Sequence, residues 1–426
     1  MRCPCGHIAR LFVFKVRVFF TGILSLTRNI IGMRRGIAFP AGFYADVIGG
    51  HEEARLLGRV YRELEQLEPY LREPRRRASV AAIIQSDVSK SVGAGPLEAD
   101  AILRMKRSSP HTQAVLGAMM ACEHEKIPYT VIPEGDLAED TLAAYGLVIL
   151  PELYVTDPKL VSFLERYVRG GGALILSGKT GLYDAKLQPL SRSAAEMLIG
   201  GSFRRVHSEY CQNDWSAYLR AENPADFSGL LAKTTPPVSD FFVEYAPDTA
   251  ETLAHFVFPC TACDETHWVN WWSPPPGADS DIPAILHNQL GAGQTLYLAY
   301  DFFTMAASER YRDTGDSFHD FLNLLGFRPA LRNLVGHPDL LRTAFFRTDT
   351  ALQIHQVSAL LGKFSGEAVP LSGGTLESAI PIYRARAVYP TEVELPVTQK
   401  DGRWFIALPD LTVQHFILCD TYPASK

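Results

Sequence analysis

The stretch from Tyr145 to Gly181, YGLVILPELYVTDPKLVSFLERYVRGGGALILSGKTG, decides the fold. Its first part, residues 147–150, is an apolar run without alternation, and residues 173–176 form a second run of the same kind. Runs of this type are typical of short strands that are buried on both faces of a sheet. The sequence therefore predicts two parallel strands joined by a crossover connection.

The residues between these two runs predict the crossover helix. Thr156 or Asp157 is placed to cap its start, and Pro158 suits its first turn. Residues 170–172 are three glycines that end it. Its apolar positions recur at helical spacing and make one face for the sheet: Leu160, Phe163, Leu164, Tyr167 and Val168.

Two further strands precede this unit. Residues 80–84 and 129–132 are apolar runs, and an amphipathic helix is expected between them over residues 111–126. A short helix is also expected over residues 137–145. Four short parallel strands linked by helices predict an α/β fold with a doubly wound, flavodoxin-like sheet.

The second half of the chain favours antiparallel pairing. Alternating segments within residues 203–275 predict an antiparallel insertion, and residues 291–293 form the turn of a hairpin between 284–288 and 294–300. Residues 336–426 are expected to form a small C-terminal β-sandwich with a turn at Asp401-Gly402. Its strands are predicted at 352–357, 393–396, 404–408 and 413–418.

Composition limits the classes of function. The net charge of −6 argues against general nucleic-acid binding. Seven irregularly spaced cysteines fit a reducing compartment, so we expect a cytoplasmic protein. Residues 1–49 are basic and predict a poorly ordered leader or a remnant of something larger, with a targeting peptide as the alternative. Lys15 and Arg17 interrupt the apolar run there and argue against a membrane span. Residues 50–78 are expected to be a linking helix.

Several of these segments resemble the beta-galactosidase trimerisation domain of family 42 and related glycoside hydrolases. The resemblance lies in residues 145–181, in PAILHNQLGAGQTLYLAYDFF and in FHDFLNLLGF. The motif positions are Pro151, Thr156, Gly171-Gly172 and Ser177. It implies a class I glutamine amidotransferase-like sheet over residues 79–335 and a homo-oligomer, a trimer. RVYRELEQLEPYL resembles the helix that enters this domain, and residues 336–426 resemble the C-terminal domain of the same enzymes.

The resemblance does not extend to catalysis. These hydrolases use two carboxylates in a (β/α)8 barrel, which takes about 250 residues, and residues 1–49 are far fewer. We therefore expect no barrel, no catalytic residue and no cofactor in this chain. The expected function is a non-catalytic oligomerisation or accessory region. The alternatives are an active glycosidase completed by a separate barrel chain, and a stand-alone carbohydrate-binding module.

A ligand on the sheet would bind at the carboxyl ends of the parallel strands. The residues predicted there are Ser86, Asp87, Glu152, Lys179 and Thr180. The alternative is an ordinary polar rim that a subunit or a barrel covers. No nucleophilic Cys follows the second strand of the opening stretch, and His111 and His124 show no motif spacing, so amidotransferase chemistry is not expected.

Two other clusters carry candidate chemistry. Trp268, Trp271 and Trp272 are expected in a core or an interface, with sugar stacking as the alternative. Cys260, Cys263 and His267, with Cys211 as a fourth ligand, form a weak zinc candidate, and a transient disulfide or inert loop cysteines are the alternatives. Because a lone CxxC is weak evidence, no metal is assigned.

Overall fold

The computed structural model describes residues 65–421, apart from residues 73, 93–108, 139, 212–215, 239, 262–273, 309–311, 337–339 and 359–369. The chain divides into two compact units. The larger unit is Ser79–Pro329, and the smaller unit joins the residues up to Ala78 with Ala330–Lys426. The chain therefore leaves the smaller unit after Ala78 and returns to it at Ala330.

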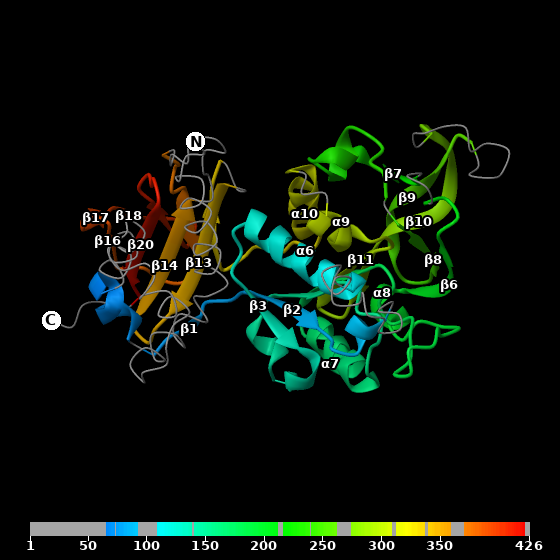
Figure 1. Ribbon diagram of the computed structural model, residues 1–426, viewed down its shortest axis with the longest axis horizontal. Helices are drawn as coiled ribbons and strands as arrows, with labels where there is room; N and C mark the ends of the chain where they lie inside the picture. The colour runs from blue at the N-terminus through cyan, green and yellow to red at the C-terminus, as the bar shows by residue number, and fades with distance from the viewer. Residues whose placement is uncertain are drawn as a thin grey trace, which may run out of the picture. The chain divides into compact units, whose positions relative to one another are not determined.

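The larger unit is built on an eight-stranded mixed sheet with the order β3-β2-β4-β5-β11-β10-β9-β7 (Figure 1). Its first five strands run parallel to one another: β3 (Tyr129–Pro133), β2 (Ala81–Gln85), β4 (Leu147–Leu150), β5 (Ala173–Ser177) and β11 (Gly293–Leu298). The remaining strands pair antiparallel: β10 (Pro276–Leu290), β9 (Glu251–Pro259) and β7 (Tyr218–Ala221).

Strands β4 and β5 confirm the two buried runs that the sequence predicts. Every residue of both strands is buried. Burying a Leu or Ile side chain contributes roughly 1.5–3 kcal/mol to stability, so these short strands form a large part of the core. Their fully apolar composition follows from this position, because helices cover both faces of a parallel sheet.

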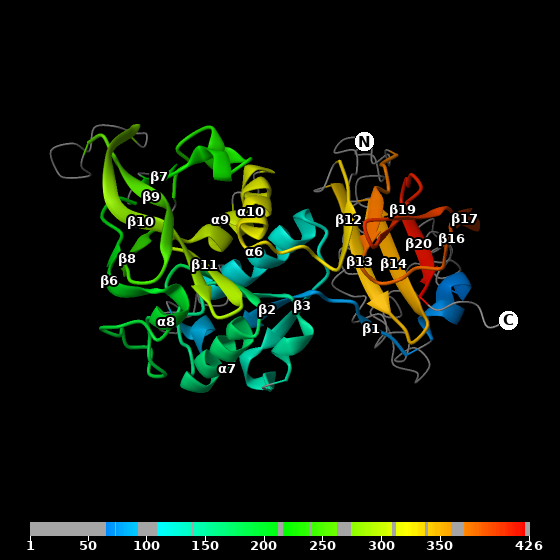
Figure 2. The ribbon, with the colours of Figure 1, turned by 180° about the vertical axis from the view of Figure 1, so that it is seen from behind.

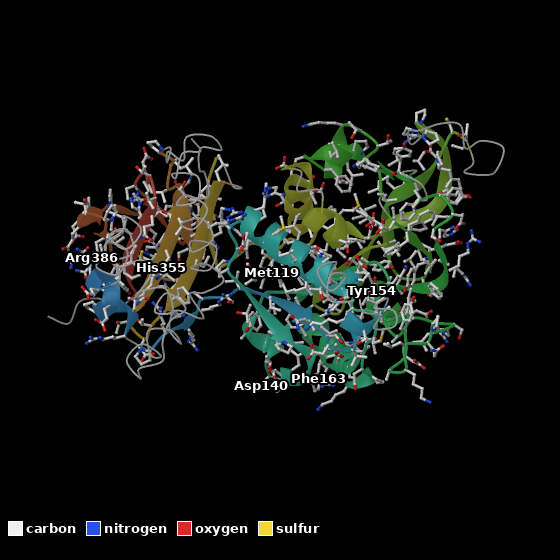
Figure 3. All side chains as sticks on the ribbon, viewed as in Figure 1. Met119, Asp140, Tyr154, Phe163, His355 and Arg386 are labelled. Atoms are coloured by element: carbon white, nitrogen blue, oxygen red, sulfur yellow. The ribbon has the colours of Figure 1, made fainter. Side chains whose placement is uncertain are left out.

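Helix α7 (Pro158–Arg169) connects these two strands. Of the two proposed caps, Asp157 is the one used, since its Oδ1 accepts the Lys159 N–H at 2.6 Å. The Thr156 hydroxyl is buried without a hydrogen-bond partner among the described residues. Leu160, Leu164 and Val168 face the core, while Phe163 is half-buried and is labelled in Figure 3. Gly171 (φ 106°) then reverses the chain toward β5, in a conformation that favours glycine.

Three helices lie on the opposite side of the parallel strands from α7: α6 (Pro110–His124), α9 (Phe302–Ser308) and α10 (Arg312–Leu324) (Figures 1 and 2). Helices α6 and α9 approach each other closely. A Cβ atom added at Gly117 of α6 would lie 1.7 Å from the Phe303 carbonyl oxygen of α9. In the described part of the chain, no helix is both long and apolar enough to cross a membrane.

Two expectations change in this unit. The helix expected over residues 137–145 is wrong, because only the 3-10 turn η4 (Leu142–Ala144) forms there. The Thr141 hydroxyl accepts the Ala138 N–H at 3.0 Å and competes with a helical backbone. The hairpin of β10 and β11 is confirmed, but β11 also pairs in parallel with β5, with Leu296 opposite Ile175. The parallel part of the sheet therefore has five strands rather than four.

The predicted antiparallel region is divided between two sheets. Strands β6 (Gly201–His207) and β8 (Phe242–Pro247) form a separate two-stranded sheet, while β7, β9 and β10 extend the main sheet. The strand expected over residues 267–272 lies outside the described residues. A short helix, α8 (Glu196–Ile199), precedes β6 and ends at Gly200 (φ 76°).

The smaller unit is rich in antiparallel strands. Residues 65–71 are helical, and Leu67 and Leu71 pack against Phe416. Asp401 and Gly402 both have positive φ and form the expected hairpin turn. One sheet is β1 (Arg76–Arg77), β13 (Leu341–Arg347), β14 (Ala351–Ser358), β20 (Gln414–Asp420), β16 (Arg384–Tyr389) and β17 (Val393–Leu395). The other is β12 (Leu331–Leu334), β15 (Thr375–Ser378), β19 (Arg403–Ala407) and β18 (Val397–Lys400).

Candidate functional site

The carboxyl ends of β2, β4, β5 and β11 meet at one edge of the main sheet. We call this the carboxyl edge and define it by the polar residues that follow these strands: Ser86, Glu152, Lys179 and Asp301. Ligands of open parallel sheets bind at this kind of edge, where the order of the strands reverses. In this sheet the reversal falls between β2 and β4, since β2 is followed along the chain by β3 on its other side.

His111 of α6 fills the gap between the ends of β2 and β4. Its Nε2 accepts the Ser86 N–H at 2.9 Å, and its Nδ1 lies 3.0 Å from the Pro151 oxygen and 3.1 Å from the Glu152 oxygen. We therefore assign the proton to Nδ1, which donates to these carbonyls. Burial lowers the pKa of His111, in agreement with a neutral ring. The imidazole therefore joins the ends of β2 and β4 at the point where the strand order reverses.

Buried hydroxyl groups hold the loop that follows β4. Each of them accepts a backbone N–H that has no partner in the strand ladder. This need for nearby acceptors explains why small hydroxyl residues follow these strands. The three pairs are Ser177 Oγ with Glu152 N at 3.1 Å, Thr180 Oγ1 with Leu153 N at 3.2 Å, and Ser89 Oγ with Val155 N at 3.0 Å. These hydroxyls are therefore part of the framework of the carboxyl edge.

Glu152 is a fully buried carboxyl group with an unusual backbone conformation, φ 46°. Tyr154, labelled in Figure 3, donates to its Oε2 at 2.8 Å, and Thr304 of α9 donates to its Oε1 at 2.6 Å. Burial raises the pKa of Glu152 to about 6, although the two hydroxyl groups and Lys179 oppose the shift. The side chain thus ties the end of β4 to α9.

Lys179 and Asp301 lie beside Glu152. The ammonium of Lys179 is 3.9 Å from the centroid of the Phe241 ring, and burial lowers the pKa of this half-buried lysine. Asp301 is 1% exposed. Its Oδ2 accepts the Asp240 N–H at 3.2 Å, while its Oδ1 has no hydrogen-bond partner among the described residues. Burial first, and then the charges of Glu152 and Asp240, raise the pKa of Asp301 well above its ordinary value.

The structure brings only some of the predicted rim residues together. Glu152 and Lys179 interact electrostatically, Ser86 reaches the carbonyl of Glu152 through His111, and Thr180 is buried in the loop framework. Asp87 is instead exposed and pairs with Lys90 at 2.6 Å, and this bond lowers the pKa of Asp87. Whether these residues bind a ligand stays a prediction.

The other predicted clusters lie largely outside the described residues. These are Trp268, Trp271, Trp272, Cys263 and His267. Cys260 is exposed and Cys211 is half-buried, and both are free thiols. Within the described ranges, no group of three or more His, Cys, Asp or Glu side chains is placed to hold a metal ion.

Sequence reasoning missed the roles of His111 and Asp301. His111 has no motif spacing, because its partners are backbone groups of two distant strands. Asp301 carries a usable signal. It directly follows the apolar run of residues 296–300 and directly precedes α9, which places an acid at a strand end beside a helix N-terminus.

Comparison with known proteins finds a match in the central part of the chain. Residues 124–317 match the family of the beta-galactosidase trimerisation domain. The Halorubrum lacusprofundi beta-galactosidase Bga is 30% identical to this chain over 162 residues, which are 37% of the chain and 20% of that protein. The chain therefore spans a fifth of the length of this relative.

Solved structures share the fold over most of the chain. The alpha-L-fucosidase isoenzyme 2 from Paenibacillus thiaminolyticus has a TM-score of 0.67 and 16% identity, covering 87% of this chain and 53% of its own. The beta-galactosidase from Bacillus circulans sp. alkalophilus has a TM-score of 0.58 and 14% identity, covering 87% of this chain and 45% of its own. The chain thus corresponds to about half of each, and the shared fold covers more of the chain than residues 124–317 do.

Proposed function

We propose that this chain is a non-catalytic oligomerisation and accessory region of a beta-galactosidase-like glycoside hydrolase. The observation that carries the proposal is the match of residues 124–317 to the trimerisation domain. The fold shared with two glycosidases over 87% of the chain supports it. The proposed partners are two further copies of the chain and a catalytic barrel.

We also infer that the larger unit is flavodoxin-like. Numbered along the chain, its parallel strands β2, β3, β4, β5 and β11 lie across the sheet in the order 2-1-3-4-5. That is the order of flavodoxin-like sheets, and helices on both sides of the strands agree with it. The two antiparallel sheets of the smaller unit support the β-sandwich expected there.

The chemistry of the carboxyl edge supports a non-catalytic role. A nucleophile needs a base within hydrogen-bond reach, and both ring nitrogens of His111 are engaged by backbone groups. The hydroxyls of Ser177 and Thr180 are likewise engaged by backbone N–H groups. The side chains that would carry chemistry at this edge therefore hold the fold together.

The oligomeric state tests the proposal directly. Size-exclusion chromatography with light scattering, on the full chain at micromolar concentration, is expected to give a mass three times the 47.2 kDa of one chain. The mass of a single chain at every concentration up to about 100 μM would contradict the proposal, because assemblies that form at working concentrations need micromolar or tighter affinity.

The second candidate is an active glycosidase that a separate barrel chain completes. The shared fold with both a fucosidase and a beta-galactosidase favours testing two substrates. We expect the purified chain alone to hydrolyse neither nitrophenyl β-galactoside nor nitrophenyl α-fucoside. Hydrolysis by the chain alone would overturn the non-catalytic proposal. Hydrolysis that appears only when a barrel chain is added would establish this second candidate.

We infer a reducing, cytoplasmic location. The support is that the four cysteines in the described part, Cys122, Cys211, Cys260 and Cys419, are all free. Labelling of the native protein from cell extract with a thiol reagent is expected to modify the exposed Cys260. A disulfide at Cys260 in freshly prepared protein would contradict this inference.

A further inference from the structure

The start of β8 is attached to the end of β11 by three contacts. The Val243 N–H donates to the Ala299 oxygen at 2.7 Å, and Phe242 forms an isolated antiparallel bridge with Tyr300. The third contact involves a side chain, since the Asp240 N–H donates to Asp301 Oδ2. Residues 240–243, which we call the joint segment, thus connect the small β6–β8 sheet to the carboxyl edge.

The position of one proton follows from the hydrogen bonds at this edge. Glu152 has a hydroxyl donor on each oxygen, and these bonds stabilise its charged form. Backbone N–H groups of Asp240 and Asp301 itself favour the charged form of Asp301, but its buried Oδ1 has no partner among the described residues. A buried carboxylate with an unpaired oxygen costs far more free energy than the neutral acid does. Of the two buried acids, Asp301 is therefore the one that keeps its proton.

The groups that face Asp301 strengthen this assignment. Among the residues that the structure describes, the one cation that faces Asp301 is the half-buried Lys179. The titratable groups around Asp301 are Glu152 and Tyr154 after β4, Lys179 after β5, Cys211 after β6, Asp240 before β8, and Tyr300. Ionisation of Asp301 would place a third carboxylate against the ammonium group of Lys179, although the Asp301 side chain itself is buried away from water.

We propose that Asp301 is a proton-operated latch, which in its neutral form holds the joint segment against the end of β11 and which releases that segment when its proton passes to solvent. Release lets water hydrate the carboxylate and separates it from Asp240. The raised pKa of Asp301 agrees with a neutral latch in the closed form. The latch makes the attachment of the β6–β8 sheet depend on pH.

Hydrogen exchange of the full chain, followed by mass spectrometry and corrected for intrinsic rates, tests the latch. The population of the open form should rise about tenfold per pH unit between two limits. The lower limit is the ordinary pKa of an aspartate, near 4, and the upper limit is the raised pKa of Asp301, above which the population levels off. Peptides that contain residues 240–247 are therefore expected to lose protection between pH 5 and pH 8, by about tenfold for each pH unit below the raised pKa of Asp301. Peptides from α7 are expected to stay unchanged.

Matched variants separate the latch from general loosening. Asp301→Asn keeps an oxygen for the Asp240 N–H but cannot ionise. In this variant the protection of the joint segment from hydrogen exchange should therefore not change with pH. Asp279→Asn removes an exposed acid that pairs with Arg220 elsewhere on the sheet, and it should respond to pH as the wild type does. Asp240→Asn keeps the backbone N–H while removing a repelling charge, so its loss of protection should be smaller.

Three results would overturn the latch. The first is equal protection of the wild-type joint segment at pH 5 and pH 8. The second is a wild-type pH response in Asp301→Asn. The third, which remains decisive if Asp301→Asn fails to fold, is a response in Asp240→Asn as large as that of the wild type.

Discussion

At the scale of single residues, His111 joins three backbone segments that are far apart in the sequence. It is fully buried, and its two ring nitrogens bind groups at the ends of β2 and β4. A histidine with no motif spacing is easily passed over in a sequence, because its partners are backbone atoms that any residue type supplies. The sequence could predict which edge of the sheet carries polar residues, but not that this imidazole fills the gap.

Replacing His111 by alanine is expected to lower the free energy of unfolding by about 3 kcal/mol, because the Ser86 N–H and two carbonyl groups lose their partner in the core. Urea unfolding followed by circular dichroism measures the change. His287→Ala is the control, since that half-buried ring bonds the Gln294 side chain at 3.0 Å, and its loss should cost less than about 1 kcal/mol. Equal losses in the two variants would show that His111 does not have the assigned role.

At the scale of elements, the sequence predicts the β4–α7–β5 unit correctly because each of its signals is local. The two strands are unalternating apolar runs, Pro158 fits the first helical turn, and Gly170 to Gly172 stop the helix. The parallel pairing of β11 with β5 is not local. The turn at residues 291–293 predicts only the antiparallel partner β10, and nothing in the pattern of Leu296 and Tyr297 identifies β5 as the second one.

The crossing of α6 and α9 depends on one glycine. Gly117→Ala should cost about 3 kcal/mol or more, since the new methyl group would overlap the Phe303 carbonyl and the helices would have to separate. At a solvent-exposed helix position the same change would instead stabilise the fold by about 1 kcal/mol through helix propensity. Gly135→Ala is the matched control, because an added Cβ there meets nothing within 4 Å. Thermal unfolding of the two variants should therefore differ clearly, and similar midpoints would contradict the close crossing.

At the scale of the whole molecule, a buried acid in the larger unit and a buried histidine in the smaller unit respond to pH in opposite directions. In the larger unit the folded-state pKa of Glu152 is raised to about 6, so the folded form holds an extra proton between about pH 4.5 and pH 6. Protonation of Glu152 through this window stabilises that unit by roughly 2 kcal/mol, and the lowered pKa of His111 opposes this gain. In the smaller unit, His355 lies buried between the rings of Phe346 and Phe416, and its Nε2 has no partner among the described residues.

Burial first, and the charge of Arg75 second, lower the pKa of His355 to about 3. The unfolded histidine takes up a proton near pH 6.5, whereas the folded one does not until about pH 3. Stability of the smaller unit is therefore complete above pH 6.5 and falls as the pH drops, by about 3 kcal/mol at pH 4.5. Calorimetry should show the two unfolding transitions moving apart between pH 7.5 and pH 4.5, with limited proteolysis identifying the smaller unit as the first to unfold.

The variant His355→Leu isolates this effect, because leucine fills the apolar site between the two rings and cannot take up a proton. Its smaller unit should keep the same midpoint at pH 4.5 and pH 7.5, apart from changes that the wild type shares. His287→Leu, in the larger unit, should leave the acid response of the smaller unit as it is. If acidification failed to lower the transition of the smaller unit relative to that of the larger unit, the pH response assigned to His355 would be refuted. If His355→Leu kept the wild-type response, another group would be its source.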